Sequence, residues 1–150
     1  MKRISEITII GFGNQAKSWA LNLRDSRVNV YIALRRDSKS IAIVRDIGFQ
    51  VVFLDENLPT DYAAILTPDE SHPEILEKLK KNEKKLTIIY AHGFSIYTYK
   101  LNEQFPNFKH LLLAPKCIAS ELRFRFETKQ SLTCFYSIEA SEGLLCFKSK

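Results

Sequence analysis

Seven short apolar runs, separated by segments with helical periodicity, constrain the fold of this chain more than any other feature. The runs are Ile7–Ile10, Val28–Ala33, Gln50–Leu54, Tyr62–Leu66, Leu86–Tyr90, His110–Ala114 and Leu132–Tyr136. Several are apolar throughout, which is typical of strands covered on both faces. Three intervening segments place their apolar residues on one helical face: Asn14–Arg24, Ser38–Ile47 and Ser71–Lys81. Strands that alternate with helices predict an α/β fold, with a Rossmann-like, doubly wound and mainly parallel sheet.

Size and composition fit one globular domain. The chain has 150 residues, of which 45% are hydrophobic and 26% charged, so we expect a single domain over residues 1–150. No apolar run approaches the ~18–20 residues that a membrane span needs. The basic start leads directly into the first strand without the apolar core of a signal peptide. We therefore expect a cytoplasmic protein with no membrane partner.

The charged, cysteine and histidine residues limit the possible partners. A net charge of +5 suits an anionic ligand, but the lysines and arginines are scattered, so we expect no nucleic-acid partner. The three cysteines show no CxxC spacing and the three histidines lie far apart in the sequence. The sequence therefore predicts no metal site in this chain.

A GxGxxA motif, residues 11–16 (GFGNQA), follows the first apolar run and opens directly into a helical segment. Gly11 permits a tight turn, Gly13 lets the backbone approach a pyrophosphate, and Ala16 lets the helix pack close to the strand. The amides of residues 13–15 are expected to face a phosphate at the helix N-terminus. Because a strand precedes the motif and a helix and second strand follow, it predicts a dinucleotide site. The alternative is a glycine turn without a ligand.

The end of the second apolar run indicates which nicotinamide cofactor the site suits. NAD sites place an Asp or Glu there to bind the ribose 2′-hydroxyl. Residues 35–40 read RRDSKS, with no acid at the expected place. Arg35 can pair with a phosphate through two hydrogen bonds, and the hydroxyls of Ser38 and Ser40 can donate to it. The sequence therefore predicts a 2′-phosphate pocket and NADP(H) as the cofactor. In the alternative interpretation, Ser38 only caps the next helix and the arginines are solvated.

Several motifs resemble those of ketol-acid reductoisomerases, in the same order and at similar separations. They are residues 9–15 (IIGFGNQ), 21–26 (LNLRDS), 66–70 (LTPDE), 91–94 (AHGF) and 114–117 (APKC). The resemblance covers residues 4–126 and continues more loosely to the end. It implies the NADP-binding Rossmann half of an NADPH- and magnesium-dependent enzyme of branched-chain amino-acid biosynthesis. Enzymes of this family rearrange an acetohydroxy acid and reduce the resulting ketone to a dihydroxy acid.

The resemblance also implies roles for individual residues. His92 matches the catalytic histidine of the family, and Lys116 matches a lysine near the metal and substrate. From the residues alone, His92 follows an apolar run, where an imidazole can exchange protons or simply occupy a turn. The implied cofactor-binding residues are Gly11, Phe12, Gly13, Asn14 and Gln15 at the pyrophosphate, Arg35, Ser38 and Ser40 at the 2′-phosphate, Asp69, Glu70, Ser71 and His72 in a further contact stretch, and Ala119 near the nicotinamide.

The chain departs from the family pattern in two places. The helical C-terminal domain of the family supplies the acidic magnesium ligands and most of the substrate pocket, and these 150 residues hold no counterpart. We therefore expect no full reaction from this chain alone, and magnesium binding only if that domain is supplied. After residues 114–116 (APK), the family has a Pro-Gly step where this chain has Cys117, Ile118 and Ala119. We expect the β-carbon of Ala119 to crowd the nicotinamide end.

Three functions remain open from the sequence. In the first, the chain is an NADP(H)-binding half that works on an acetohydroxy acid together with a helical domain. In the second, it is a stand-alone NADP-binding, sensing or assembly protein without catalysis. In the third, it is a small NADPH-dependent reductase whose substrate site lies at a dimer interface. Apolar residues near the end predict a surface for self-association or for a helical partner chain. These residues are Phe135, Tyr136, Leu144, Leu145 and Phe147.

Overall fold

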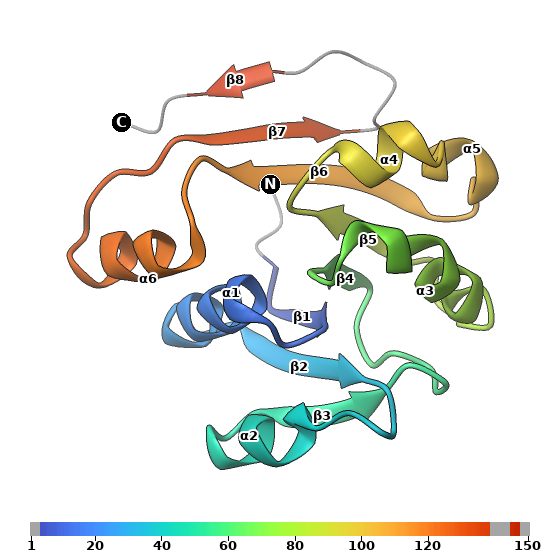
Figure 1. Cartoon of the computed structure of the whole chain (residues 1–150), viewed down its shortest axis with the longest axis horizontal. Helices are drawn as coiled ribbons and strands as arrows, with labels where there is room; N and C mark the ends of the chain where they lie inside the picture. The colour runs from blue at the N-terminus through green and yellow to red at the C-terminus, as the bar shows by residue number, and fades with distance from the viewer. Residues whose placement is uncertain (1–3, 139–144, 148–150) are drawn as a thin grey trace.

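The computed structural model describes residues 4–138 and 145–147. Across these residues, eight strands form one sheet in the order β3-β2-β1-β4-β5-β6-β7-β8 (Figure 1). The strands are β1 (Glu6–Ile10), β2 (Asn29–Leu34), β3 (Gln50–Phe53), β4 (Tyr62–Ile65), β5 (Thr87–Tyr90), β6 (Lys109–Pro115), β7 (Cys134–Ile138) and β8 (Leu145–Phe147). β1 to β6 pair in parallel, whereas β7 and β8 add to the β6 edge in antiparallel fashion. The predicted Rossmann-like, mainly parallel sheet is confirmed.

Helices cover both faces of this sheet. They are α1 (Asn14–Asp25), α2 (Ser40–Asp46), α3 (His72–Leu79), α4 (Phe94–Thr98), α5 (Leu101–Gln104) and α6 (Ala119–Glu127), with a 3-10 turn, η1 (Asp69–Ser71), directly before α3. α1, α2 and α6 pack on one face, and α3, α4 and α5 pack on the other (Figure 1). This alternation of layers is what parallel strands joined by crossover helices require.

The core forms because each central strand sends neighbouring side chains to opposite faces. Ile9 and Ile89 belong to the apolar cluster beneath α1, whereas Ile10, Ile88 and Tyr90 belong to the cluster beneath α3. All five are almost fully buried. Strands that bury both faces are mostly apolar, which explains why isoleucine fills these central positions of β1 and β5.

Two polar pairs are built into this core. Thr8 and Thr60 are fully buried, and their hydroxyl oxygens lie 2.7 Å apart. The ring of Tyr90 stacks on that of His110, and the Tyr90 hydroxyl lies 2.9 Å from His110 Nδ1. His110 Nε2 lies 3.0 Å from the Phe105 carbonyl oxygen, which can only accept, so Nε2 carries the proton and Nδ1 accepts from Tyr90. Burial lowers the pKa of His110, which favours the neutral imidazole.

The sequence pattern located the strands of residues 7–136 within two residues, but it missed β8, α4, α5 and α6. α4 and α5 have five and four residues, which is too short for a helical period to show. α6 has no buried residue and leaves Phe124 and Phe126 exposed, so it carries no clear apolar face. The helix predicted from Ser38 begins at Ser40, and the one predicted from Ser71 begins at His72.

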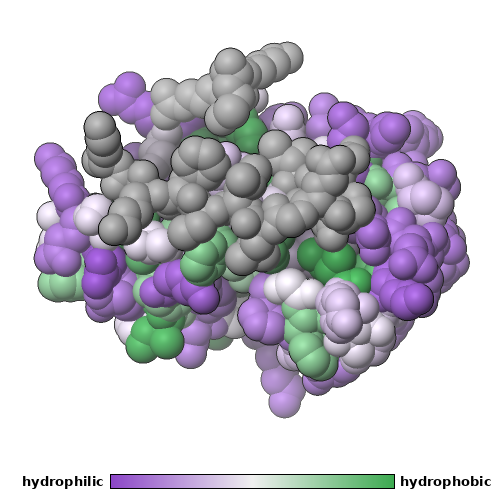
Figure 2. All heavy atoms as spheres, turned by 90° about the horizontal axis from the view of Figure 1, so that it is seen from above, coloured by the Kyte–Doolittle hydropathy of each residue, from purple (hydrophilic) through white to green (hydrophobic). Residues whose placement is uncertain are grey.

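The apolar C-terminal residues are only partly visible in the structure. Phe135 and Tyr136 lie in β7 and are partly buried. Leu144 lies outside the described residues, as do the side chains of Leu145 and Phe147. In the view of Figure 2, the coloured apolar residues form small groups between hydrophilic ones. Within residues 4–138 and 145–147, no helix combines the length and apolar character that crossing a membrane requires.

Candidate functional site

A cavity of about 490 Å³ lies at the carboxyl ends of β1, β2 and β4. β1 sits between β2 and β4, so the chain winds in opposite directions on its two sides. Ligands of open α/β sheets bind at such a point. The lining residues are Gly11, Phe12, Gly13, Ala33, Leu34, Arg35, Ser38, Ser40, Leu54, Thr67, Pro68, Glu70, Ser71, Glu74, Ile75 and Lys78. One cavity thus joins the glycine turn to the Arg-Ser segment.

The two glycines of the turn after β1 have different physical roles. Gly11 has φ +94°, and a β-carbon there would lie 2.7 Å from Thr67 Cγ2 and 3.2 Å from the Leu66 carbonyl oxygen. The turn therefore requires glycine at this position. Gly13 has φ −78°, and its β-carbon position meets no atom of the described residues within 4 Å. Its bare backbone borders open space, as close approach of a pyrophosphate requires.

The N-terminus of α1 adds hydrogen-bond donors beside this turn. α1 begins at Asn14 with no side-chain cap and no acidic residue in its first turn. The first amides of a helix have no partner inside the helix, and the helix dipole makes this end positive. The amides of Gly13, Asn14 and Gln15 are therefore placed to donate to an anion. These features fit the phosphates of a dinucleotide.

The two neighbouring arginines after β2 point to different partners. Arg36 donates to Asp55 Oδ2 at 2.7 Å and to Glu56 Oε1 at 2.6 Å, and its guanidinium lies over the ring of Phe53. Its hydrogen bond also lowers the pKa of Asp55. Arg35 lines the cavity, its side chain is 69% exposed, and its Nε lies 3.7 Å from Asp37 Oδ1 in a long ion pair. Of these two arginines, Arg35 is therefore the one placed to bind a phosphate in the cavity.

The serines after Arg35 lie on the same wall. α2 begins at Ser40, and Lys39, at the position before it, makes no capping hydrogen bond with its side chain. The Ser38 hydroxyl oxygen accepts from the Ser40 amide at 3.3 Å, and both serines line the cavity. The Arg-Ser segment predicted for the 2′-phosphate is thus assembled as one surface.

Helix α3 supplies two charged lining residues that sequence analysis missed. Lys78 Nζ donates to Glu74 Oε1 at 2.7 Å, and both side chains reach the cavity. The only signal in the sequence is their i,i+4 spacing on the polar face of an amphipathic helix. That spacing could not indicate which solvent-facing residues would border a ligand.

The stretch after β4 divides between the cavity and the core. Glu70 and Ser71, both expected to contact the cofactor, line the cavity. The Ser71 hydroxyl lies 2.7 Å from the Pro68 carbonyl oxygen, to which it donates, and 2.8 Å from Thr67 Oγ1. His72, also predicted to contact the cofactor, is buried and does not line the cavity.

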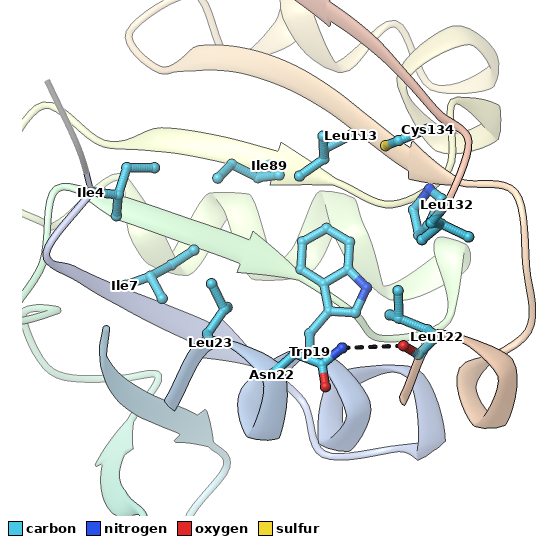
Figure 3. A pocket seen from close by; sticks show the side chains of 11 residues that line it. Ile4, Ile7, Trp19, Asn22, Leu23, Ile89, Leu113, Leu122, Leu132 and Cys134 are labelled. Carbon is cyan, nitrogen blue, oxygen red and sulfur yellow. Dashed lines mark hydrogen bonds between the residues drawn. The ribbon is translucent and has the colours of Figure 1, made fainter. Parts of the chain in front are cut away.

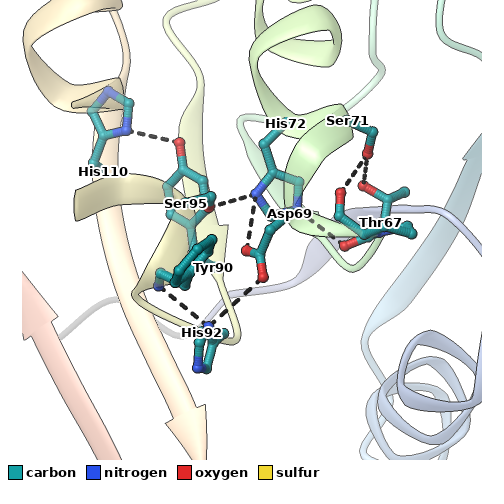
Figure 4. Close-up of polar contacts among 10 residues, drawn as sticks. Thr67, Asp69, Ser71, His72, Tyr90, His92, Ser95 and His110 are labelled. Carbon is teal, nitrogen blue, oxygen red and sulfur yellow. Dashed lines mark hydrogen bonds and ion pairs between the residues drawn. The ribbon is translucent and has the colours of Figure 1, made fainter. Parts of the chain in front are cut away.

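His72 instead fastens the loop after β4 to α4. Its Nε2 donates to the Thr67 carbonyl at 3.1 Å, and its Nδ1 accepts from the Ser95 hydroxyl at 2.7 Å (Figure 4). Burial lowers the pKa of His72, so the neutral imidazole that this pattern needs is favoured. His72 thus supports the cavity wall from behind.

Asp69 links this support to His92. Its Oδ1 is buried without a hydrogen-bond partner among the described residues and lies 3.8 Å from His72 Nδ1. Its Oδ2 lies 3.8 Å from His92 Nδ1 (Figure 4). The His92 ring is 73% exposed at the carboxyl end of β5, and its Nδ1 accepts from the Phe94 amide at 3.2 Å. When His92 is neutral, its proton is therefore on Nε2.

Comparison with known families identifies the family to which the chain belongs. A family model described as the NADPH-binding domain of acetohydroxy acid isomeroreductase matches residues 3–145. The chain belongs to this family. The resemblance inferred from the motifs is thereby confirmed, and the matched part of the family is its NADPH-binding domain.

Relatives of this isomeroreductase domain are much longer than the chain. The ketol-acid reductoisomerase (NADP(+)) of Helicobacter acinonychis (strain Sheeba) is 35% identical over 144 residues, which cover 89% of this chain and 41% of the relative. The protein of the same name from Blochmanniella floridana is 35% identical over 129 residues, covering 81% of this chain and 26% of the relative. The isomeroreductase domain thus spans less than half of these relatives.

Solved structures show the same architecture. An NADH-preferring ketol-acid reductoisomerase from an uncultured archean superposes with a TM-score of 0.74 at 26% identity, covering 90% of this chain and 43% of the other. A hypothetical protein, SMa0349 from Sinorhizobium meliloti, shares the fold with a TM-score of 0.70 at 19% identity, covering 91% and 75%.

The remaining predicted residues of the isomeroreductase domain lie outside the cavity. Lys116, directly after β6, is exposed, and its Nζ lies 4.4 Å from the centre of the Phe135 ring. Ala119 begins α6, where its carbonyl oxygen accepts from the Ser18 hydroxyl at 2.8 Å, and it borders a separate cavity together with Asn14. Ala119 is therefore held beside the N-terminus of α1.

A further cavity, of about 280 Å³, lies between α1, α6 and the sheet (Figure 3). Its lining is apolar apart from Asn22, the Trp19 indole and the Cys134 thiol, whose pKa burial raises. Trp19 Nε1 is buried and has no hydrogen-bond partner in the described part of the chain. Among those residues, no group of three or more His, Cys, Asp or Glu side chains is arranged to hold a metal ion. This cavity is a mainly apolar space between α1, α6 and the sheet.

Proposed function

We propose that this isomeroreductase domain binds NADP(H) in the cavity at β1, β2 and β4. The turn of residues 11–15 receives the pyrophosphate, and Arg35, Ser38 and Ser40 receive the 2′-phosphate. The observation that carries this proposal is that the glycine turn and the segment with Arg35, Ser38 and Ser40 line the same cavity. A guanidinium and two hydroxyls offer charge-assisted hydrogen bonds to the 2′-phosphate dianion of NADP(H). NAD(H) has a 2′-hydroxyl there and cannot accept these bonds as a charged group.

A binding titration tests this proposal with a matched control inside the chain. We expect the purified chain to bind NADPH more tightly than NADH, and Arg35→Ala to weaken NADPH binding by about tenfold or more. Arg36→Ala is the control, because it removes the same charge from the next residue, whose side chain is already paired with Asp55 and Glu56. Equal, weak binding of both cofactors, or equal losses in the two variants, would contradict the proposal.

We infer that His92 and Lys116 serve the chemical step on the same edge of the sheet. Bound NADPH would supply a hydride to a ketone. His92 keeps Nδ1 on the Phe94 amide, so its Nε2–H is left to donate a hydrogen bond to the substrate ketone. Lys116 places an ammonium at the end of β6, beside Phe135, where it can attract the carboxylate of an acetohydroxy acid.

We also propose that this edge works with a partner, either a helical domain or a second copy of the chain. Phe94 and Tyr97 on α4, and Ile118 before α6, are apolar yet 51%, 88% and 74% exposed. The ring centroid of Phe94 lies 6.3 Å from that of His92, and exposed apolar side chains of this kind mark an interaction surface. Full isomeroreductase chemistry would need acidic magnesium ligands from the helical domain, and the chain alone is proposed not to complete it.

One observation favours a second candidate function, a stand-alone NADP-binding or sensing protein. Ala119 carries a β-carbon where the family pattern has glycine, and its position is fixed by the hydrogen bond from Ser18. NADPH binding without oxidation of NADPH in the presence of acetohydroxy acids, at every concentration of the chain, would support this second function. Oxidation of NADPH that rises with dimer formation would support a small reductase with a shared site.

A further inference from the structure

Two charged side chains of α3 border the cavity together with the Arg-Ser segment. Lys78 Nζ and Glu74 Oε1 lie 2.7 Å apart, one helical turn from each other. Glu74 is 70% exposed and Lys78 is 41% exposed. An exposed i,i+4 ion pair of this kind is weak, because water solvates both charges and the side chains lose little by separating. Either group can therefore exchange its partner for a ligand.

The charges on the cavity wall balance only because Lys78 is present. The positive lining residues are Arg35 and Lys78, and the negative ones are Glu70 and Glu74. The hydrogen bond from Lys78 lowers the pKa of Glu74, and the charge of Arg35 acts in the same direction, so Glu74 is ionised at neutral pH. A 2′-phosphate carries nearly two negative charges at this pH. A phosphate bound there therefore lies near the carboxylates of Glu70 and Glu74, and the charges of Arg35 and Lys78 must offset their repulsion.

Glu74 also supplies a carboxylate, a group that the segment after β2 does not place at the expected position. An NAD site needs a carboxylate that accepts from the ribose 2′-hydroxyl, and this is normally supplied at the end of β2. Here the end of β2 supplies Arg35, while α3 supplies a carboxylate, Glu74, that lines the same cavity. The cavity thus contains both a cationic group suited to a phosphate and an acceptor suited to a hydroxyl.

We propose that the Glu74–Lys78 pair sets the preference between NADPH and NADH. With NADPH, Lys78 shares its charge with the 2′-phosphate and screens it from Glu74. With NADH, Glu74 accepts from the 2′-hydroxyl while Lys78 stays near it as a counter-ion. This inference rests on the proposed function, because it concerns the adenosine end of the same cofactor site.

Dissociation constants of the full chain for NADPH and NADH, measured at about 0.15 M salt, test the pair. Lys78→Gln should weaken NADPH binding by about tenfold or more while changing NADH binding by less than about threefold, since one charge-assisted contact is lost only with the phosphate. Glu74→Gln should act in the opposite sense, tightening NADPH binding and weakening NADH binding. The double variant should restore part of the NADPH affinity that Lys78→Gln loses.

Lys80→Gln is the matched control, because it removes an equal charge from the C-terminal end of the same helix. Lys80 pairs with Glu77 at 2.7 Å and does not line the cavity. If Lys78→Gln and Lys80→Gln lower NADPH affinity equally, or if Lys78→Gln lowers NADPH and NADH affinity by the same factor, the selectivity role is refuted while cofactor binding stands. If the unmodified chain binds neither cofactor, the proposed function fails and this inference fails with it.

Discussion

The two glycines of the turn after β1 allow stability and cofactor binding to be separated by the same substitution. Gly11→Ala should destabilise the fold by about 2–4 kcal/mol, because an alanine at φ +94° is strained by about 1–2 kcal/mol and its β-carbon overlaps Thr67 Cγ2 and the Leu66 carbonyl. Gly13→Ala should cost less than about 1 kcal/mol, because its backbone is extended and its β-carbon meets open space. The same methyl group stands where a pyrophosphate must approach. We therefore expect Gly13→Ala to weaken NADPH binding by about tenfold or more.

Urea denaturation followed by the fluorescence of Trp19 gives the free energies of unfolding. Trp19 is the single tryptophan of the chain and is only 7% exposed, so its emission reports global unfolding. NADPH titrations of the folded variants give the second readout. Equal stability losses in Gly11→Ala and Gly13→Ala would refute the assignment of strain to Gly11 alone. Unchanged NADPH affinity in a folded Gly13→Ala variant would refute the placement of the pyrophosphate.

Two further predictions concern the buried polar groups. Burial lowers the pKa of His72 and of His110 below about 6.5, so below that pH the unfolded chain binds more protons. The free energy of unfolding should accordingly be highest above pH 6.5 and fall as the pH drops toward the folded-state pKa values. The fall should be at most about 1.4 kcal/mol per pH unit for each histidine. A free energy of unfolding that stays constant between about pH 7.5 and pH 5.5 would contradict this prediction. In the core, Thr60 donates to the Tyr62 carbonyl, so Thr8 must donate to Thr60. Thr60→Val should therefore lower the free energy of unfolding by about 1–3 kcal/mol, and Thr8→Val by about 1 kcal/mol. Urea denaturation that gives the reverse order would exclude this arrangement of protons.

The role of a residue could be predicted from the sequence where it depends on residues next to it in the chain. Gly11 and Gly13 were predictable, because a glycine turn between a strand and a helix is a local pattern. Arg35 was predicted as the phosphate ligand, but the pairing of the neighbouring Arg36 was not, because its partners Asp55 and Glu56 come from the segment after β3. The structure places Arg35 on the cavity wall and holds Arg36 in ion pairs.

The residues after β4 show the same limit. His72 belongs to a motif stretch, yet its ring is buried because α4 packs over it and offers the Ser95 hydroxyl. Lys78 and Glu74 carry an ordinary helix-surface spacing, and they become lining residues because α3 runs beside the end of β1. Neither outcome depends on the residue types alone.

The amino-acid sequence by itself determined the mainly parallel sheet, the crossover helices α1, α2 and α3, the glycine turn and the family, because these arise from periodicity and from short contiguous motifs. The tertiary structure decided which side chains border the cofactor cavity and which are held in ion pairs or buried. The physical reason is that a side chain's charge and hydrogen-bonding capacity are set by groups that distant segments bring within a few ångströms. Strand order and helix packing, rather than sequence neighbours, select those groups.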